Sequence, residues 1–243
     1  MTEATPAEPG GRPTIRARIE RVLDHNDDTR SLFLAPLGDG RVRFVPGQFI
    51  SILIPLAEEI RTRPYTIASS PEEAGPIEIC FNRVSGGRGV AWLFERQRGD
   101  VLAFTGPFGT FTLERAPAAE AVFIAEGTAI APIRPMIRRA IASSGRAMIT
   151  LLYAAKSERH LLFRAEFEEL ARRDLRFKFD TIVAPAQTLY GRMLEAAEQR
   201  WVKADDDRSR VFYVCGIGPG VIAIRNLLRG AGYERRAVHY EQW

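Results

Sequence analysis

The sequence predicts a two-domain chain in which an antiparallel β-barrel precedes an α/β domain with a parallel sheet. In the first half, short apolar segments alternate with polar residues and are separated by closely spaced Gly and Pro turns, a pattern typical of barrels. In the second half, buried strands alternate with amphipathic helices, as in a parallel sheet covered on both faces. With 243 residues, 46% of them hydrophobic, the chain can fill both cores. We predict a disordered leader over 1–12, the barrel over 13–115 and the α/β domain over 118–243.

Barrel strands are expected wherever apolar and polar residues alternate between turn signals. Ile15, Ala17 and Ile19 alternate with charged residues, so we expect a half-exposed strand over 14–23. The same criterion gives strands over 29–34, 42–45, 49–55, 63–70, 77–84, 101–105 and 111–113, and a short helix over 90–96.

After a linker over 114–120 the period changes to that of alternating strands and helices. Strands are expected over 121–125, 147–154, 177–183, 211–215 and 237–240, with helices over 132–143, 161–173, 193–201 and 219–230.

Composition excludes several classes of protein. No apolar run approaches the roughly 20 residues that span a bilayer, and the polar start is no signal region, so a cytoplasmic location is expected. Cys80 and Cys215 are interpreted as free thiols, and two cysteines are too few for a four-cysteine iron–sulfur cluster. The three histidines lack metal-ligand spacing. The net charge of +4 suits an acidic partner, but scattered arginines without a basic tail argue against nucleic acid.

The segment 63–66 carries a guanidinium, an aromatic ring and a hydroxyl on one strand. Arg63 and Tyr65 share one face and Thr66 lies on the other, while Pro64 favours a sheet edge. A guanidinium suits a phosphate group, a phenol ring suits a flat heterocycle and a hydroxyl suits a ring heteroatom. An ordinary edge strand with solvated charges is the alternative.

Three glycine-containing loops are candidates for phosphate or ligand contact. The loop 86–90 opens a helix whose N-terminus favours anions, although a hairpin turn has the same composition. The loop 126–132 follows the first strand of the second half, where dinucleotides bind, but it lacks G-x-G-x-x-G and also fits a plain tight turn. The turn 215–220 lies at a late strand end.

The order of these motifs is more specific than any one of them. Arg-x-Tyr-Thr, a glycine loop, Gly-Pro-x-Gly, Gly-Thr-x-Ile-Ala-Pro, Cys-Gly-x-Gly-Pro and a terminal Glu-x-aromatic follow one another along the chain. In this order the sequence from Ile15 to Trp243 resembles the ferredoxin–NADP reductase-like flavoprotein family, in particular its bacterial type. The resemblance implies a barrel that binds FAD, or FMN in some branches, and hydride transfer with NAD(P)H. It also implies delivery of single electrons to an acidic carrier such as ferredoxin or flavodoxin.

The resemblance also implies roles for the first-domain residues. Arg63 would pair with the flavin pyrophosphate, Tyr65 would lie against the isoalloxazine, and Thr66 would bond near N5, with Pro64 in the same motif. The loop residues Gly87, Gly89, Val90 and Ala91 would complete the phosphate site without the family's usual hydroxyl residue.

For the second domain, the resemblance implies a coenzyme site. Gly127, Thr128 and Pro132 match the coenzyme loop, whereas Glu126 and Ala129 stand where the family has glycine. Cys215 and Gly216 would lie near the nicotinamide, Glu241 near the reacting centre, and Trp243 over the flavin face until nicotinamide displaces it.

Lys156 and Arg192 match basic positions for the adenosine 2′-phosphate, which favours NADPH over NADH; the alternative is that both are solvated surface charges. Two other functions remain open at this point. One is a reductase of free flavin or of an oxygenase component, and the other is a non-catalytic flavin- or nucleotide-binding regulatory module.

Overall fold

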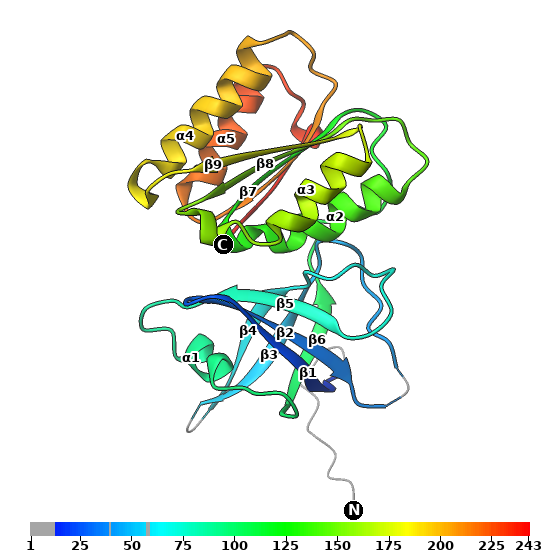
Figure 1. Ribbon diagram of the computed structural model, residues 1–243, viewed down its shortest axis with the longest axis vertical. Coiled ribbons are helices and arrows are strands. Elements are labelled where there is room, and N and C mark those ends of the chain that lie inside the picture. Colours follow the sequence, from blue (N-terminus) through cyan, green and yellow to red (C-terminus); the bar gives the residue numbers. More distant parts are fainter. Residues whose placement is uncertain (1–12, 39, 57–58) are drawn as a thin grey trace, which may run out of the picture. The chain divides into compact units, whose positions relative to one another are not determined.

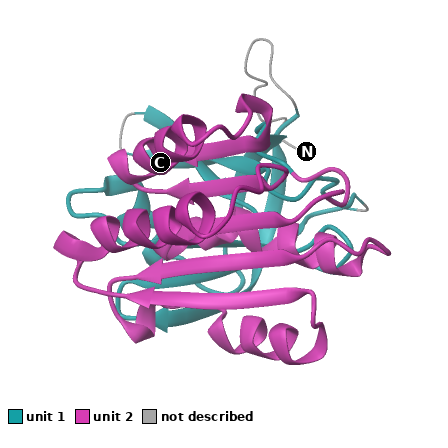
Figure 2. Cartoon of the chain, turned by 90° about the horizontal axis from the view of Figure 1, so that it is seen from above, with its two compact units in different colours: residues 1–112 teal, residues 113–243 magenta. Residues whose placement is uncertain are grey.

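A computed structural model describes residues 13–38, 40–56 and 59–243 of the chain. The chain divides into two compact units, residues 1–112 and 113–243, each of which is described by itself (Figure 2). The division falls just before the expected linker over 114–120. The leader predicted over 1–12 lies outside the described residues.

The first unit is a closed antiparallel sheet of six strands in the order β4-β3-β6-β1-β2-β5 (Figure 1). The strands are β1 (Ile15–Asn26), β2 (Thr29–Pro36), β3 (Phe49–Leu56), β4 (Glu59–Thr66), β5 (Ile77–Asn82) and β6 (Val101–Phe108). The sheet closes just beyond β4, where Ile67 bridges Ile79 and the N–H of Ala68 donates to the Glu78 carbonyl at 2.7 Å. The predicted antiparallel barrel is therefore confirmed.

Alternation along the strands fills the barrel. In β3, Ile50, Ile52 and Ile54 are fully buried, and the residues between them are partly exposed. In β1, Ala17 and Ile19 point inward, as their alternation with charged residues predicts. Side chains from all of the core-facing strands meet in one apolar cluster, against which helix α1 (Arg88–Phe94) packs with Leu93 and Phe94.

Two expected barrel strands do not form. Residues 42–45 are irregular because the Gln48 side chain accepts the Val45 N–H at 2.9 Å, and Gln48 N–H donates back to the Val45 carbonyl at 3.1 Å. Residues 111–113 are also irregular, although Phe111 and Leu113 are buried. In both segments apolar side chains reach a core without joining a strand ladder. The strand expected over 63–70 ends at Thr66, and Ser69 instead accepts the Glu78 N–H through its hydroxyl at 3.0 Å.

The second unit is a five-stranded parallel sheet in the order β11-β10-β7-β8-β9, with helices on both faces (Figure 1). Its strands are β7 (Ala121–Glu126), β8 (Ile149–Ala155), β9 (Phe177–Val183), β10 (Val211–Gly216) and β11 (Val238–Gln242). The chain runs outward from β7 to β9 and then returns to the other side of β7. The order of the strands therefore reverses between β7 and β10, where ligands of such sheets bind.

Helices α4 (Ala186–Glu198) and α5 (Pro219–Gly230) cover one face of this sheet. Leu189 and Ile224 of these helices pack in one cluster with Val122 and Val214 of the sheet. Helices α2 (Ile130–Ala142) and α3 (Arg164–Arg173) lie on the opposite face, where Phe167 of α3 contacts Phe177 and Phe179. The helix expected over 193–201 begins earlier, at Ala186, and ends in a π-helical turn over Gln199–Lys203.

Buried charge is neutralised by ion pairs at the amino end of β10. The Arg210 side chain is about one-tenth exposed and bonds Glu120 at 2.8 Å and Asp205 at 2.7 Å, while the Tyr233 hydroxyl lies 3.3 Å away. These carboxylates raise the pKa of Arg210, and Arg210 in turn lowers the pKa of Asp205 to about 2. The network fixes the loop before β10 to the start of β7.

We predict that Arg210→Ala lowers the free energy of unfolding by about 2–4 kcal/mol, because it leaves Glu120 part-buried without its cation. The matched control Arg172→Ala removes an exposed ion pair with Glu169 and should cost less than about 0.5 kcal/mol. Urea denaturation of both variants measures the difference. Equal losses in the two variants would contradict the structural role of Arg210.

Candidate active site

The Arg63 side chain lies against the start of helix α1. A Cβ atom placed on Gly89 would come within 3.5 Å of the Arg63 Cγ and 3.1 Å of the Ile54 Cδ1. Strand β4 and the glycine loop, which are separate segments of the sequence, are thus neighbours in the fold. The guanidinium is exposed, and one of its N–H groups donates to the Thr62 carbonyl at 2.9 Å.

The start of α1, which lies against the aliphatic part of the Arg63 side chain, presents backbone amides. Gly87 is the N-cap residue, and the Ala91 N–H already donates to the Gly87 carbonyl at 3.0 Å. The amides that precede this first helical bond are those of Arg88, Gly89 and Val90. A side chain at position 87 would collide with Val90, since a Cβ there would lie 2.9 Å from its Cγ1. The Arg63 side chain and these amides lie on neighbouring elements, and a cation together with backbone amides is a combination that suits a phosphate group.

Tyr65 is half-buried, and its ring meets Phe81 edge-on with 5.5 Å between centroids. Burial raises the pKa of the Tyr65 hydroxyl to about 12, with Arg63 acting in the opposite direction. The side chain therefore offers a neutral aromatic ring at physiological pH. Thr66 is buried, and Pro64 is exposed opposite Ser51 of β3. The four motif residues thus occupy the end of one strand.

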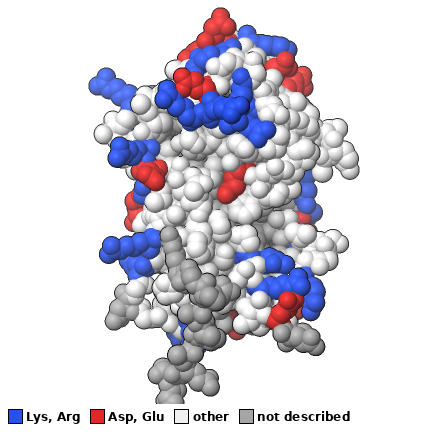
Figure 3. All heavy atoms as spheres, turned by 180° about the vertical axis from the view of Figure 1, so that it is seen from behind, with Lys and Arg blue, Asp and Glu red and all other residues white. Residues whose placement is uncertain are grey.

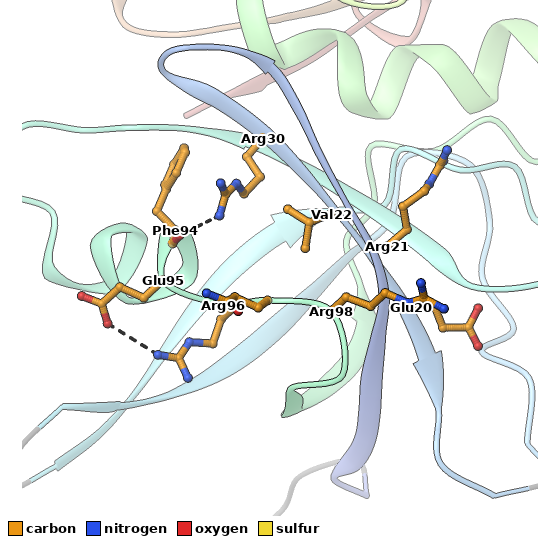
Figure 4. A pocket seen from close by; sticks show the side chains of 9 residues that line it. Glu20, Arg21, Val22, Arg30, Phe94, Glu95, Arg96 and Arg98 are labelled. Carbon is orange, nitrogen blue, oxygen red and sulfur yellow. Dashed lines mark hydrogen bonds and ion pairs between the residues drawn. The ribbon is translucent and has the colours of Figure 1, made fainter.

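Two hollows adjoin the ends of α1. A hollow of about 410 Å³ is lined by the glycine loop from Arg83 to Ala91 and lies at the amino end of the helix. A larger one, about 640 Å³, lies at the carboxyl end, where Arg30 points to the Phe94 carbonyl and Arg96 to Glu95 (Figure 4). The larger hollow contains none of the predicted flavin residues. The candidate site therefore lies at the smaller hollow, whose lining includes the predicted residues Gly87, Val90 and Ala91.

In the second unit, the coenzyme loop opens as a tight helical turn over Gly127–Ala129 that leads into α2. Gly127 has a positive φ of 55°, which a glycine adopts without strain. The buried Tyr153 hydroxyl donates to the Gly127 carbonyl at 2.9 Å and accepts the Leu162 N–H at 3.1 Å. Thr128 is part-exposed, and Pro132 lies in the first turn of α2, where a missing N–H costs no helical bond.

The structure brings Cys215, Gly216, Glu241 and Trp243 together at the carboxyl ends of β10 and β11. Cys215 and Glu241 are direct partners in the parallel register. The Trp243 N–H donates to the Gly216 carbonyl at 3.1 Å, and the Trp243 carbonyl accepts the Gly218 N–H at 3.4 Å. The backbone thus holds the final residue against the Cys-Gly turn, and its side chain is 42% exposed.

Burial raises the pKa of the two titratable side chains in this cluster, Cys215 and Glu241. It raises the pKa of Glu241 from 4.5 to about 7, and the Glu241 Oε2 atom is buried without a hydrogen-bond partner in the described residues. Burial and the Glu241 charge also raise the pKa of the Cys215 thiol, and a hydrogen bond with Trp243 only partly offsets them. Cys215 is therefore a neutral thiol, while Glu241 titrates near neutrality.

Lys156 and Arg192 lie on other elements. Lys156 is exposed directly after β8, and Arg192 is exposed on α4. Neither belongs to the strands that carry Cys215 and Glu241. Glu126, which had no predicted role, ends β7 and accepts a hydrogen bond from the Ile217 backbone. The sequence marks Glu126 only as an acidic residue at a position where the resembling family has glycine.

Comparison with known proteins identifies both domains. An oxidoreductase FAD-binding domain model matches residues 17–113, and an oxidoreductase NAD-binding domain model matches residues 123–225. The chain is 29% identical to ferredoxin–NADP reductase B of Sorangium cellulosum, covering 94% of this chain and 97% of that protein. It is 30% identical to the ferredoxin reductase component of 3-ketosteroid-9-alpha-monooxygenase of Mycobacterium tuberculosis, covering 99% of this chain and 68% of the relative.

Solved structures show the same fold. A ferredoxin NADP⁺ reductase from Neisseria gonorrhoeae with bound FAD and NADP matches with a TM-score of 0.76 and 19% identity, covering 94% of this chain and 98% of that one. An Amycolatopsis cytochrome P450 reductase matches with a TM-score of 0.79 and 24% identity, covering 95% and 69%.

A FAD-binding barrel followed by an NAD-binding α/β unit defines a two-domain flavoprotein oxidoreductase. The chain belongs to the ferredoxin–NADP reductase-like flavoprotein family. It is an NAD(P)H-dependent flavoprotein reductase with FAD as its cofactor, which confirms the predicted enzyme class and sets aside the non-catalytic alternative. The described residues contain no helix that is both long and apolar enough to cross a membrane.

We predict that Glu241→Gln reduces the pH dependence of stability. Because the folded pKa of Glu241 is above its ordinary 4.5, the folded state binds the proton more tightly. The contribution of this group is therefore largest below pH 4.5 and is lost as the pH rises through about 7. Allowing for its part exposure, the wild type should lose about 2 kcal/mol more than the variant between pH 4.5 and 8.

Chemical denaturation of both proteins across this pH range measures that difference. Glu126, whose pKa burial also raises, is present in both proteins, so its effect cancels. Parallel stability curves for wild type and Glu241→Gln would show that the pKa of Glu241 does not change on folding, which would contradict the effect of burial.

Proposed function

We propose that the chain oxidises NADPH through FAD and passes electrons one at a time to a ferredoxin-type carrier protein. The observation that supports this most is that one chain of the family places Arg63 beside the start of α1 in its first unit and reverses the order of its parallel strands between β7 and β10 in its second. Bound FAD supplies the step between two-electron and one-electron chemistry. The protein supplies binding, orientation and exclusion of water.

Arg63 and the amides of Arg88, Gly89 and Val90 bind the flavin pyrophosphate. The permanent charge of arginine and its fork of donors match two phosphate oxygens, and the helix start adds oriented N–H groups. The neutral Tyr65 ring would pack against the flavin ring system, and the Thr66 hydroxyl would hydrogen-bond near its N5. Pro64 holds this strand without competing for the ligand with a backbone N–H.

The coenzyme occupies the carboxyl ends of β7 and β10. Gly127 and Thr128 contact its pyrophosphate, and Pro132 shapes the first turn of α2. Cys215 and Gly216 lie at the nicotinamide, and Glu241 provides a carboxyl group that gains or loses a proton near pH 7. Trp243, whose side chain is exposed, would cover the flavin face until nicotinamide displaces it.

Lys156 and Arg192 favour NADPH over NADH, because two cations bind the charged 2′-phosphate of NADPH better than they bind the neutral ribose diol of NADH. Both are exposed, so a phosphate reaches them without desolvation of a buried charge.

The carrier is an acidic protein, a ferredoxin or a flavodoxin. The chain has a net charge of +4, and Figure 3 shows more Lys and Arg than Asp and Glu on one face. Opposite charge on the carrier increases the association rate. Reduction of an oxygenase component is the second candidate, favoured by the monooxygenase reductases among the relatives, including that of propane 2-monooxygenase of Rhodococcus jostii. The cytoplasm is proposed as the location because it supplies reduced coenzyme.

We predict that Arg63→Ala weakens FAD binding by at least about tenfold, since a charge-assisted phosphate contact is lost. The matched control is Arg61→Ala on the same strand, whose side chain pairs with Glu59 and should leave FAD binding unchanged. Flavin absorbance per protein after gel filtration, followed by FAD titration, measures the effect. Full flavin retention by Arg63→Ala would contradict the pyrophosphate assignment.

We predict that Lys156→Ala raises the KM for NADPH about fivefold to tenfold and changes the KM for NADH less than twofold, because the 2′-phosphate is absent from NADH. Lys178→Ala, which removes another exposed lysine, serves as the control for net charge. Steady-state reduction of ferricyanide with each coenzyme measures the ratio. Equal changes for both coenzymes would identify Lys156 as a solvated surface charge.

A further inference from the structure

Glu126 stands at the point where the order of the parallel strands reverses. It is the last residue of β7, and the residue before it, Ala125, pairs with Cys215 of β10. Its side chain is half-buried. A carboxylate at this position lies in the part of an α/β sheet where ligands bind.

Two helices begin at this end of the sheet, one after β7 and one after β10. The helical turn that leads into α2 starts at Gly127 with Glu126 as its N-cap residue, and α5 starts at Pro219 with Gly218 as its N-cap. Neither start has a hydrogen bond from the side chain of its N-cap residue. The amides and the positive dipole ends of both helices therefore favour an anion at this end of the sheet.

The Glu126 carboxylate already acts as that anion. It does not cap its own turn but crosses to the next loop, where the Ile217 N–H donates to it. A Cβ atom placed on Gly216 would lie 3.6 Å from the Glu126 Oε2 and 3.7 Å from its Cβ. The side chain thus packs directly on the Cys-Gly turn and joins the β7–α2 loop to the β10–α5 loop.

We propose that Glu126 is an internal competitor of the coenzyme phosphates and sets the affinity of the chain for nicotinamide dinucleotides. This inference rests on the proposed placement of the coenzyme at these two loops. A bound pyrophosphate meets a like charge on a half-buried side chain, and it gains the Ile217 amide only when Glu126 releases it. A glycine at this position, as in the resembling family, would neither repel the pyrophosphate nor occupy the Ile217 amide.

Glu126→Gln is the direct test, because glutamine keeps the shape and still accepts from Ile217 but carries no charge. Isothermal titration of the full, FAD-loaded chain with ADP-ribose should give a Kd about tenfold lower than in the wild type, corresponding to about 1.4 kcal/mol. Glu126→Thr, a smaller uncharged variant, should also bind more tightly. Flavin content and thermal denaturation establish that each variant is folded.

The matched control is Glu158→Gln, which removes an exposed carboxylate after β8 that pairs with Arg164. Its Kd for ADP-ribose should stay within about twofold of the wild type, since an exposed charge is screened. An unchanged or higher Kd in both Glu126 variants would overturn the competition while leaving the reductase function intact. If the wild type and all variants fail to bind ADP-ribose and NADP⁺, the proposed coenzyme placement fails together with this inference.

Discussion

Backbone pairing at strand ends places Arg63 and Tyr65 in the first unit and the Cys215–Trp243 cluster in the second. The closure of the barrel at Ile67 and Ala68 holds the end of β4, which carries Arg63 and Tyr65. The parallel register of β10 and β11 sets Glu241 beside Cys215, and two further backbone bonds hold Trp243 to the same turn. These bonds do not depend on the identity of the side chains. The functional residues can therefore change between relatives while their positions stay the same.

Desolvation is the common cause of the unusual protonation states at the site. Burial raises the pKa of Tyr65, Glu126, Cys215 and Glu241 alike, because a partly apolar surrounding disfavours the charged form of each. The phenol and the thiol remain neutral at physiological pH. Glu241, with a pKa of about 7, is the member of this set whose charge responds to modest changes in pH.

Much of the fold follows from side-chain period alone, since alternation in β1 and β3 and apolar runs in β7 and β8 correspond to real strands. The strand predictions over 42–45 and 111–113 were wrong, because irregular segments that bury single side chains show the same alternation. Motif order predicted the family and named Cys215 and Glu241 as candidates, and the parallel register sets these two residues side by side. It could not predict that the Ala91 amide is used within α1, or that Glu126 reaches Ile217, because both depend on backbone partners elsewhere.

The two ends of the parallel sheet treat buried charge in opposite ways. At the amino end, Arg210 is matched by Glu120 and Asp205, so the charges there stabilise the fold and leave little for a ligand to bind. At the carboxyl end, an oxygen of Glu241 is buried without a partner in the described chain, and Glu126 takes one amide from a neighbouring loop. An unsatisfied buried group costs folding free energy that a suitable ligand recovers on binding. The folding free energy lost at the carboxyl end therefore adds to the binding free energy of a ligand that supplies the missing hydrogen bonds.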